Sequence, residues 1–292
     1  MKRSTSKGLI ALISTSLIWG SSFPIIKIVV MNISDYTYVW LRSLIAICGL
    51  MPYILYYMAK VCIDEVSCKP FTVGVRGGLL AGIFYALGLW LQGLGTRYTT
   101  ASNSAFITGL SIVFVHLYSY FILRRYSLKL ILSLALALSG LYLLTMPSGG
   151  LNIGDILVLM GSFMWASQII IIDRFSMSNP LIFTFFEMIP AISFIIPDVL
   201  FNSLKTIETL YIIEIAYLAL ICSNIAFALQ VYGQRFISPA IAALIFLLEP
   251  VSASFFAYLF LHEIMKITQL CGASLILMGM YVASLDKALL EK

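Results

Sequence analysis

The chain has 292 residues, of which 61% are hydrophobic and only 11% are charged. Its mean hydropathy of +1.01 excludes a soluble globular domain and predicts an integral membrane protein. The formal net charge of +5 indicates no nucleic-acid partner, because an uneven distribution of basic residues among the loops of a membrane protein accounts for it.

Ten apolar stretches follow one another along the chain, and each is long enough to cross a hydrocarbon core of roughly 30 Å as a helix. The connections are short, which predicts one helical bundle without a soluble domain. The first apolar run continues to Met31 without a small-residue cleavage site, so we expect a span and not a cleaved signal peptide. The expected spans are 8–31, 35–59, 74–96, 100–123, 128–146, 153–173, 179–202, 209–232, 238–261 and 267–286.

The second half of the chain repeats the first at shifts of 138 to 146 residues, which are nearly constant within each pair of spans. Each copy holds an odd number of spans, so the second copy is inverted in the membrane. The sequence therefore predicts an all-α polytopic membrane protein with two inverted five-helix repeats, at 1–147 and 148–292. Such repeats are typical of transporters. The matching pairs include Trp19 with Trp165, Gln92 with Gln230, Gly95 with Gly233, and Arg97 with Arg235.

The basic residues are distributed unevenly between the two sides of the predicted bundle. Only Arg97, Lys205 and Lys266 fall in loops on the side opposite the N-terminus, whereas most other Lys and Arg residues fall on the N-terminal side. Because basic loops are retained in the cytoplasm, we expect both termini to be cytoplasmic. The expected location is the cytoplasmic membrane.

Ionisable side chains inside the spans are candidates for coupling or gating, because a charge in lipid is costly and usually lines a cavity or has a partner. Arg42 and Glu187 correspond to each other at a shift of 145 residues. We expect them to form an ion pair, either one that breaks during transport or a static bridge, unless Arg42 extends to the membrane interface. Glu249 precedes Pro250, which interrupts helical hydrogen bonding and favours either a cation or proton site or a simple kink. Lys27 is the fourth embedded charge of this kind.

Aromatic and amide side chains near the middle of the spans are candidates for substrate binding, because small-molecule sites combine apolar walls with a few oriented polar groups. Trp19 and Trp165 lie mid-span and not at the membrane interface, where tryptophan is usually enriched. Tyr85 and Gln92 lie on a glycine-rich face of the third span that allows close helix packing, within the chain or in a homodimer. The remaining candidates, each of which has packing against a neighbouring helix as its alternative role, are Ser22, Asn103, Gln168 and Asn224.

The sequence contains no pattern typical of an enzyme, a metal site or a cofactor site. The histidines, His116 and His262, have no acidic or cysteine partner at ligand spacing, and no glycine-rich loop followed by lysine indicates nucleotide binding. We expect His116 to make a structural hydrogen bond. Three of the five cysteines lie in spans, and Cys62 and Cys68 lie in a loop, so we expect free thiols.

Four segments carry a family resemblance when they are taken together. They are WGSSFP at 19–24, TTASNSAFI at 99–107, LEPV at 248–251 and LFLHE at 259–263. In this order and spacing they resemble the drug/metabolite transporter superfamily, specifically its EamA-type exporters. The resemblance covers nearly the whole chain and implies ten transmembrane helices in two inverted repeats, a central cavity, alternating access, and export of amino acids or other small metabolites.

These observations predict a secondary transporter that exports small metabolites, with amino acids the leading class. Its expected partners are a small-molecule substrate and the lipid bilayer. The two repeats differ where Ser111 and Ile112 correspond to Glu249 and Pro250, so we expect any coupling residue in the second repeat.

Three alternatives remain open at this point. They are a flippase for lipid-linked carriers, a transporter of nucleotide sugars, and a passive channel. The embedded charges nearly cancel, so the sequence shows no strong preference for anionic cargo, which weakens the nucleotide-sugar alternative. The passive channel is weakened because the sequence has no filter-like run of residues and no ring of charge.

Overall fold

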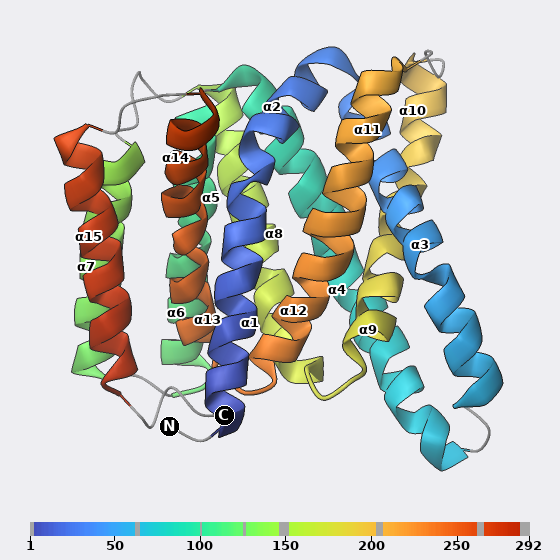
Figure 1. Cartoon of the computed structure of the whole chain (residues 1–292), viewed down its shortest axis with the longest axis horizontal. Coiled ribbons are helices and arrows are strands. Elements are labelled where there is room, and N and C mark those ends of the chain that lie inside the picture. The colour runs from blue at the N-terminus through green and yellow to red at the C-terminus, as the bar shows by residue number, and fades with distance from the viewer. Residues whose placement is uncertain are drawn as a thin grey trace.

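A computed structural model describes residues 3–61, 65–99, 101–124, 127–145, 152–202, 207–261 and 266–286. Every element in these ranges is helical, and ten helical segments are long and apolar enough to cross a membrane. They form one bundle whose helices run roughly vertically in Figure 1, where the first helix begins and the last helix ends at the lower end. The predicted all-α fold with ten spans in two five-helix halves is confirmed.

Five spans are single helices, and five are built from successive pieces. The single helices are α3 (Asp35–Lys60), α4 (Glu65–Tyr98), α7 (Leu128–Thr145), α8 (Ile153–Phe175) and α15 (Ile267–Ser284). The composite spans are α1 (Arg3–Gly20) with α2 (Ser22–Asn32); α5 (Ala101–Gly109) with α6 (Ser111–Phe121); α9 (Pro180–Met188), the 3₁₀ segment η1 (Ile189–Phe194) and α10 (Ile195–Asn202); α11 (Thr209–Tyr217), the π-helical segment η2 (Leu218–Ile225) and α12 (Ala226–Gln234); and α13 (Pro239–Phe246) with α14 (Leu248–Leu261).

The predicted spans match these elements closely, with one clear difference. Helix α4 begins at Glu65, well before the predicted start at 74. An apolar window does not detect a helix that continues through polar residues beyond the hydrocarbon core. The predicted boundary between the repeats, at 147 and 148, lies outside the described residues, so the limits of the two repeats stay a prediction.

Side-chain caps explain where several spans begin. The Ser34 hydroxyl accepts hydrogen bonds from the backbone amides of Tyr36 and Thr37 at the start of α3. Asn152 and Asp155 form a reciprocal capping box at the start of α8. Such caps satisfy backbone donors that have no partner within the helix.

The glycine-rich face of α4 packs within the chain. A methyl group at Gly78 or Gly82 would collide with the backbone carbonyl oxygens of Phe183 and Glu187, respectively. Close approach of two helix backbones in a membrane depends on such small residues. This face holds α4 against α9, and a homodimer stays a prediction.

Helices α7 and α15 form a pair at the left of Figure 1, away from the centre of the bundle. The bundle contains two large apolar clusters, the first of which includes residues of α7 and α15, and Trp19 packs against both clusters. The functional candidates of the middle spans therefore lie where the two clusters meet.

One expectation about the cysteines was wrong. Cys68 is disulfide-bonded, whereas Cys48, Cys222 and Cys271 are free. The expectation rested on the positions of the cysteines along the sequence, which do not decide whether two thiols meet in the folded chain. Cys62 and His262 lie outside the described residues.

Candidate functional site

A cavity of about 750 Å³, including the space at its open mouth, lies among mid-span residues of both halves. Spans 1 to 4 line it from the first half, and spans 6, 8 and 9 line it from the second. The five spans of each half thus contribute unequally, and the peripheral helices α7 and α15 do not reach it.

Most residues that line the cavity occur as pairs at corresponding positions of the two halves. Inverted repeats are related by a pseudo-two-fold axis, so residues that approach this axis from one half meet their counterparts from the other. Tyr85 and Ser223 also correspond, and their hydroxyl oxygens lie 3.4 Å apart. The cavity therefore lies on the axis. The pairs are Trp19 with Trp165, Phe23 with Ile169, Leu89 with Phe227, Gln92 with Gln230, Ala105 with Ala243, Thr108 with Phe246, Gly109 with Leu247, and Ser111 with Glu249.

Aromatic rings form a continuous wall of the cavity. The ring centroid of Trp19 lies 5.0 Å from that of Phe227 and 5.2 Å from that of Phe246. Trp165 lies 6.2 Å from Phe227 on the other side. These distances are typical of favourable aromatic pairs. The wall gives an apolar surface on which a flat or branched side chain can pack.

The two corresponding tryptophans differ in their hydrogen bonds. The indole Nε1 of Trp19 donates to the backbone carbonyl of Cys222 at 3.0 Å. Cys222 lies in η2, where the π-helical pattern alters backbone hydrogen bonding. The Nε1 of Trp165 is buried and has no hydrogen-bond partner within the described part of the chain. One tryptophan is therefore tied to the backbone, and the other is held by packing.

Amide side chains supply the neutral polar surface of the cavity. Gln168 and Gln230 bond each other through both amide groups, at 3.2 and 3.1 Å. The Nε2 of Gln168 also donates to the carboxyl group of Glu187 at 2.7 Å. In the first half, the Nε2 of Gln92 donates to the hydroxyl of Thr108 at 3.1 Å. These bonds fix the orientation of all three amides.

The predicted ion pair between Arg42 and Glu187 does not form, so this expectation was wrong. The Nε of Arg42 donates to the Ser223 hydroxyl at 2.9 Å, and its Nη1 donates to the Tyr38 hydroxyl at 2.7 Å. Glu187 is fully buried behind Gln168 and does not line the cavity. Correspondence between the repeats matches the positions of the two residues, but Arg42 turns toward η2 whereas Glu187 turns toward α8.

Glu249 lines the cavity at a break in the ninth span. Helix α13 ends at Phe246 and α14 begins at Leu248, so the interruption at Leu247 lies two residues before Glu249. The Glu249 carboxylate forms no hydrogen bond or ion pair with the residues that the structure describes. Its charge is therefore available to a molecule in the cavity.

The break in the ninth span was predicted from Pro250, but proline is not its full cause. The fourth span is interrupted at Leu110, between α5 and α6, although Ser111 and Ile112 follow it. The interruption therefore belongs to the fold of both halves. It places Ser111 and Glu249 in the first turn of a helix, where backbone amides lack acceptors within the helix.

Several predicted substrate-binding residues lie outside the lining of the cavity. Tyr85 is fully buried against the aromatic wall, and its ring packs edge-on against Trp165 and Phe227. The Ser22 hydroxyl donates to the Trp19 carbonyl. Asn224 donates to the carbonyl of Ala46, Asn103 is buried in α5, and His116 donates to the carbonyl of Ile112. These bonds of Ser22 and Asn224 each join two helices, whereas that of His116 lies within α6.

Other lining residues were missed in the sequence, although a signal for them exists. Phe227 and Phe246 correspond to Leu89 and Thr108, and Ser111 corresponds to Glu249. The symmetry that related the tryptophans therefore relates these residues as well. Marking the counterpart of each candidate would have found Ser111.

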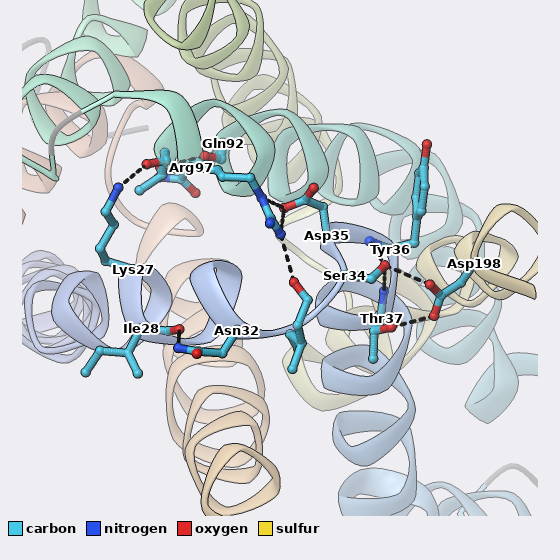
Figure 2. A network of polar contacts seen from close by, with 12 residues as sticks. Lys27, Ile28, Asn32, Ser34, Asp35, Tyr36, Thr37, Gln92, Arg97 and Asp198 are labelled. Atoms are coloured by element: carbon cyan, nitrogen blue, oxygen red, sulfur yellow. Dashed lines mark hydrogen bonds and ion pairs between the residues drawn. The ribbon is translucent and has the colours of Figure 1, made fainter. Parts of the chain in front are cut away.

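A polar network at the upper end of the bundle holds Lys27, the fourth embedded charge (Figure 2). The Nζ of Lys27 donates to the backbone carbonyls of Thr96 and Thr99, at 2.7 and 3.1 Å, where α4 ends. Nearby, Arg97 forms an ion pair with Asp35 at 3.0 Å. Lys27 does not line the cavity, so its charge serves the packing of α2 against α4.

An equivalent arginine contact occurs at both ends of the bundle. At the upper end, the Nη2 of Arg97 donates to the carbonyl of Ile33 at 2.8 Å (Figure 2). At the lower end, the Nη2 of Arg235 donates to the carbonyl of Ser178, also at 2.8 Å. Both donors and both acceptors are counterparts in the repeat. Each arginine fastens the end of one helix to the turn that joins the first two spans of its half.

Comparison with known proteins gives two matches to one family and a common fold. The profile of the EamA-like transporter family matches residues 6–146 and again residues 152–285. A protein of Archaeoglobus fulgidus named as an uncharacterized transporter is 30% identical over 273 residues, which cover 92% of this chain and 83% of that protein. Another uncharacterized transporter of this organism is 22% identical over 289 residues, with coverage of 96% and 98%.

A crystal structure has the same arrangement of helices. It superimposes with a TM-score of 0.75 at 14% sequence identity, over 96% of this chain and 97% of that chain. At this identity the likeness concerns the fold alone.

Proposed function

Since this chain belongs to the EamA-like transporter family, we propose that it is a secondary transporter that exports small metabolites, amino acids foremost, by alternating access. The observation that carries the proposal is the symmetry of the cavity, whose lining comes as corresponding pairs from two inverted halves. A site on the axis that relates inverted repeats can be reached from either side by the same motion of one half against the other.

The chemistry of the cavity supports small, amphipathic cargo. An aromatic wall lies beside oriented amides and charges of both signs. Binding sites for small molecules combine apolar walls with a few polar groups in this way. A nucleotide sugar would bring two phosphate charges into a cavity where Arg42 is the one basic residue lining the described walls and Glu249 opposes it.

Interruptions of the helices supply points at which the spans can bend. Span 1 is interrupted at Ser21, span 4 at Leu110 and span 9 at Leu247. All three positions lie within two residues of residues that line the cavity. Hinges are a few residues that absorb changes in backbone angles. We propose that the halves of these spans tilt at these positions when access changes.

The proposed orientation places the lower end of Figure 1 in the cytoplasm. Lys7, Lys60 and Arg235 lie there, whereas Arg97 and Lys266 lie at the upper end. The bias toward basic residues at the lower end supports cytoplasmic termini. A reporter fused after Ser284 and active only in the cytoplasm tests this orientation, and inactivity of that fusion beside an active periplasmic or extracellular reporter would reverse it.

The decisive experiment is counterflow of labelled amino acids in proteoliposomes that contain the purified protein. We expect saturable uptake of at least one amino acid that is accelerated when the same unlabelled compound is loaded inside. Flux that rises linearly with concentration and ignores the internal compound would indicate a channel. A folded protein that exchanges no amino acid would refute the amino-acid assignment and turn attention to lipid-linked carriers.

A further inference from the structure

The cavity contains two opposite charges that do not neutralise each other. Arg42 and Glu249 are the charged side chains among the described lining residues, and they form no ion pair. An ionised side chain in a membrane protein is costly unless it has a counter-charge or hydrogen bonds. Neither group has a counter-charge among the described residues that line the cavity.

Arg42 keeps part of its hydrogen-bonding capacity free. Its Nε and Nη1 donate to the hydroxyls of Ser223 and Tyr38, which are neutral acceptors. Its Nη2 has no acceptor among the described residues. These contacts hold the guanidinium in place without compensating its charge. A planar guanidinium with a free edge is well suited to a carboxylate.

Glu249 has still fewer partners, because no described side chain donates to its carboxylate. It follows Phe246 on the ninth span, and the ring of Phe246 packs against Trp19. A carboxylate near the faces of aromatic rings is a favourable place for an ammonium group, which is attracted both to the negative charge and to the rings.

The two charges lie near the same stretch of η2. Arg42 donates to Ser223 of this segment, and the carbonyl of Cys222 accepts from the indole of Trp19. Gly20, which follows Trp19, lies against the backbone carbonyl of Glu249. The Trp19 ring of the aromatic wall is therefore held close to the chain segments that carry both charges. Glu187, by contrast, is separated from the cavity by Gln168 and cannot reach a bound molecule.

We propose that Arg42 and Glu249 are the two counter-ions of the cargo and restrict it to zwitterions, an inference that rests on the proposed function. The Nη2 of Arg42 donates to the carboxylate of the cargo, and the Glu249 carboxylate accepts from its ammonium group. The side chain of the cargo packs on the aromatic wall. The occupied cavity is then electrically neutral, so cargo and protein cross between access states without an uncompensated charge.

This assignment separates molecules that differ by a single group. An amine without a carboxylate leaves Arg42 uncompensated, and a carboxylic acid without an amine places its charge beside Glu249. Each mismatch leaves one buried charge without a partner, which is a large penalty in binding.

The test measures the dissociation constants of matched trios by the intrinsic fluorescence of the cavity tryptophans in purified, full-length protein. The trios are alanine, ethylamine and propionate; leucine, 3-methylbutylamine and 4-methylpentanoate; and phenylalanine, phenethylamine and 3-phenylpropionate. We expect the zwitterion of at least one trio to bind about tenfold or more tightly than its amine and its acid.

Variants give the second half of the test. Glu249→Gln is expected to weaken the binding of the zwitterion by about tenfold or more. It should also make the acid bind more tightly than the amine, because the carboxylate of the acid then pairs with Arg42 and meets no opposing charge. Arg42→Gln is expected to reverse the order in favour of the amine. Glu214→Gln is the matched control, since Glu214 lies in α11, does not line the cavity and bonds none of the described lining residues, so the same chemical change there should leave the order unchanged.

The outcomes distinguish this inference from the proposed function. If the wild type binds and exchanges amino acids but binds the matched amine equally well, the inference is overturned and the export function stands. The inference is likewise overturned, and the export function stands, if Glu249→Gln keeps the wild-type order of amine and acid affinities. If the folded wild type binds no compound of any trio, the amino-acid function itself fails. Because the wild-type comparison needs no variant, misfolding of Glu249→Gln leaves the test intact.

Discussion

The two halves of this protein contain the same five spans in two different conformations. Both are interrupted at corresponding positions of spans 4 and 9. In the first half, span 1 is broken at Ser21 while α3 and α4 are continuous; in the second, α8 is continuous while η1 and η2 interrupt spans 7 and 8. The differences fall in mid-span segments, whereas the arginine contacts at the ends are equivalent. One module thus has rigid ends and an adaptable middle.

The largest expected difference between the halves concerns the third and eighth spans. Gly82 faces the backbone of α9, whereas its counterpart Leu220 is 40% exposed. Gly82→Leu should lower the free energy of unfolding by about 3 kcal/mol or more, because helix backbones in contact must separate. The control Leu220→Ala should change it by less than about 1 kcal/mol. Reversible unfolding in mixed micelles measures both, and equal losses would contradict the asymmetry.

The arginine contacts should respond alike in both halves. Arg97→Gln and Arg235→Gln each remove a charged donor from a backbone carbonyl. We expect each to cost about 1 to 2 kcal/mol in the same unfolding experiment. A loss confined to one variant would mean that only one end of the bundle depends on this contact.

The tryptophan pair should show a smaller difference. Trp19→Phe removes the bond to the Cys222 carbonyl, whereas Trp165→Phe removes no hydrogen bond to the described residues. Since the loss of ring size is the same, Trp19→Phe should be more destabilising by about 1 kcal/mol. Equal stabilities of the two variants would show that the Trp19 bond adds nothing to the resting conformation.

The smallest effect is expected at the ion pair between Arg97 and Asp35. The lower end has no equivalent pair, because Pro180 stands at the position that corresponds to Asp35. The side chains of the pair are 29% and 15% exposed. Asp35→Asn should therefore cost only about 0.5 kcal/mol, and less at high salt. An effect that is independent of salt would indicate that the Asp35 carboxylate acts mainly through hydrogen bonds.

The spans and their duplication were predictable because lipid forces the backbone to satisfy its hydrogen bonds within each helix, which ties a span to an apolar run. The cavity was predictable only in part. Trp19, Gln92, Trp165 and Gln168, identified by mid-span position and polarity, do line it, and their role in substrate binding stays a prediction. The rotation of each helix about its axis decides whether a side chain such as Tyr85 or Glu187 faces the cavity or a neighbouring helix.

That rotation depends on packing between helices, which single-sequence patterns do not contain. The glycines of α4 bring α9 so close that Glu187 is enclosed, and η2 turns Ser223 toward Arg42. The 3₁₀ segment contains Pro190, but the π-helical segment has neither proline nor glycine to mark it in the sequence.

Lys27 has a consequence for the electric field within the bundle. Its ammonium group lies on the last carbonyls of α4, a helix of 34 residues whose aligned peptide dipoles place partial negative charge at this end. The lysine thus caps a helix other than its own and cancels much of the field that the helix end would create. At this end of the bundle the charge of Lys27 and the partial charge of the helix end compensate each other, as the charges of Arg97 and Asp35 do beside them.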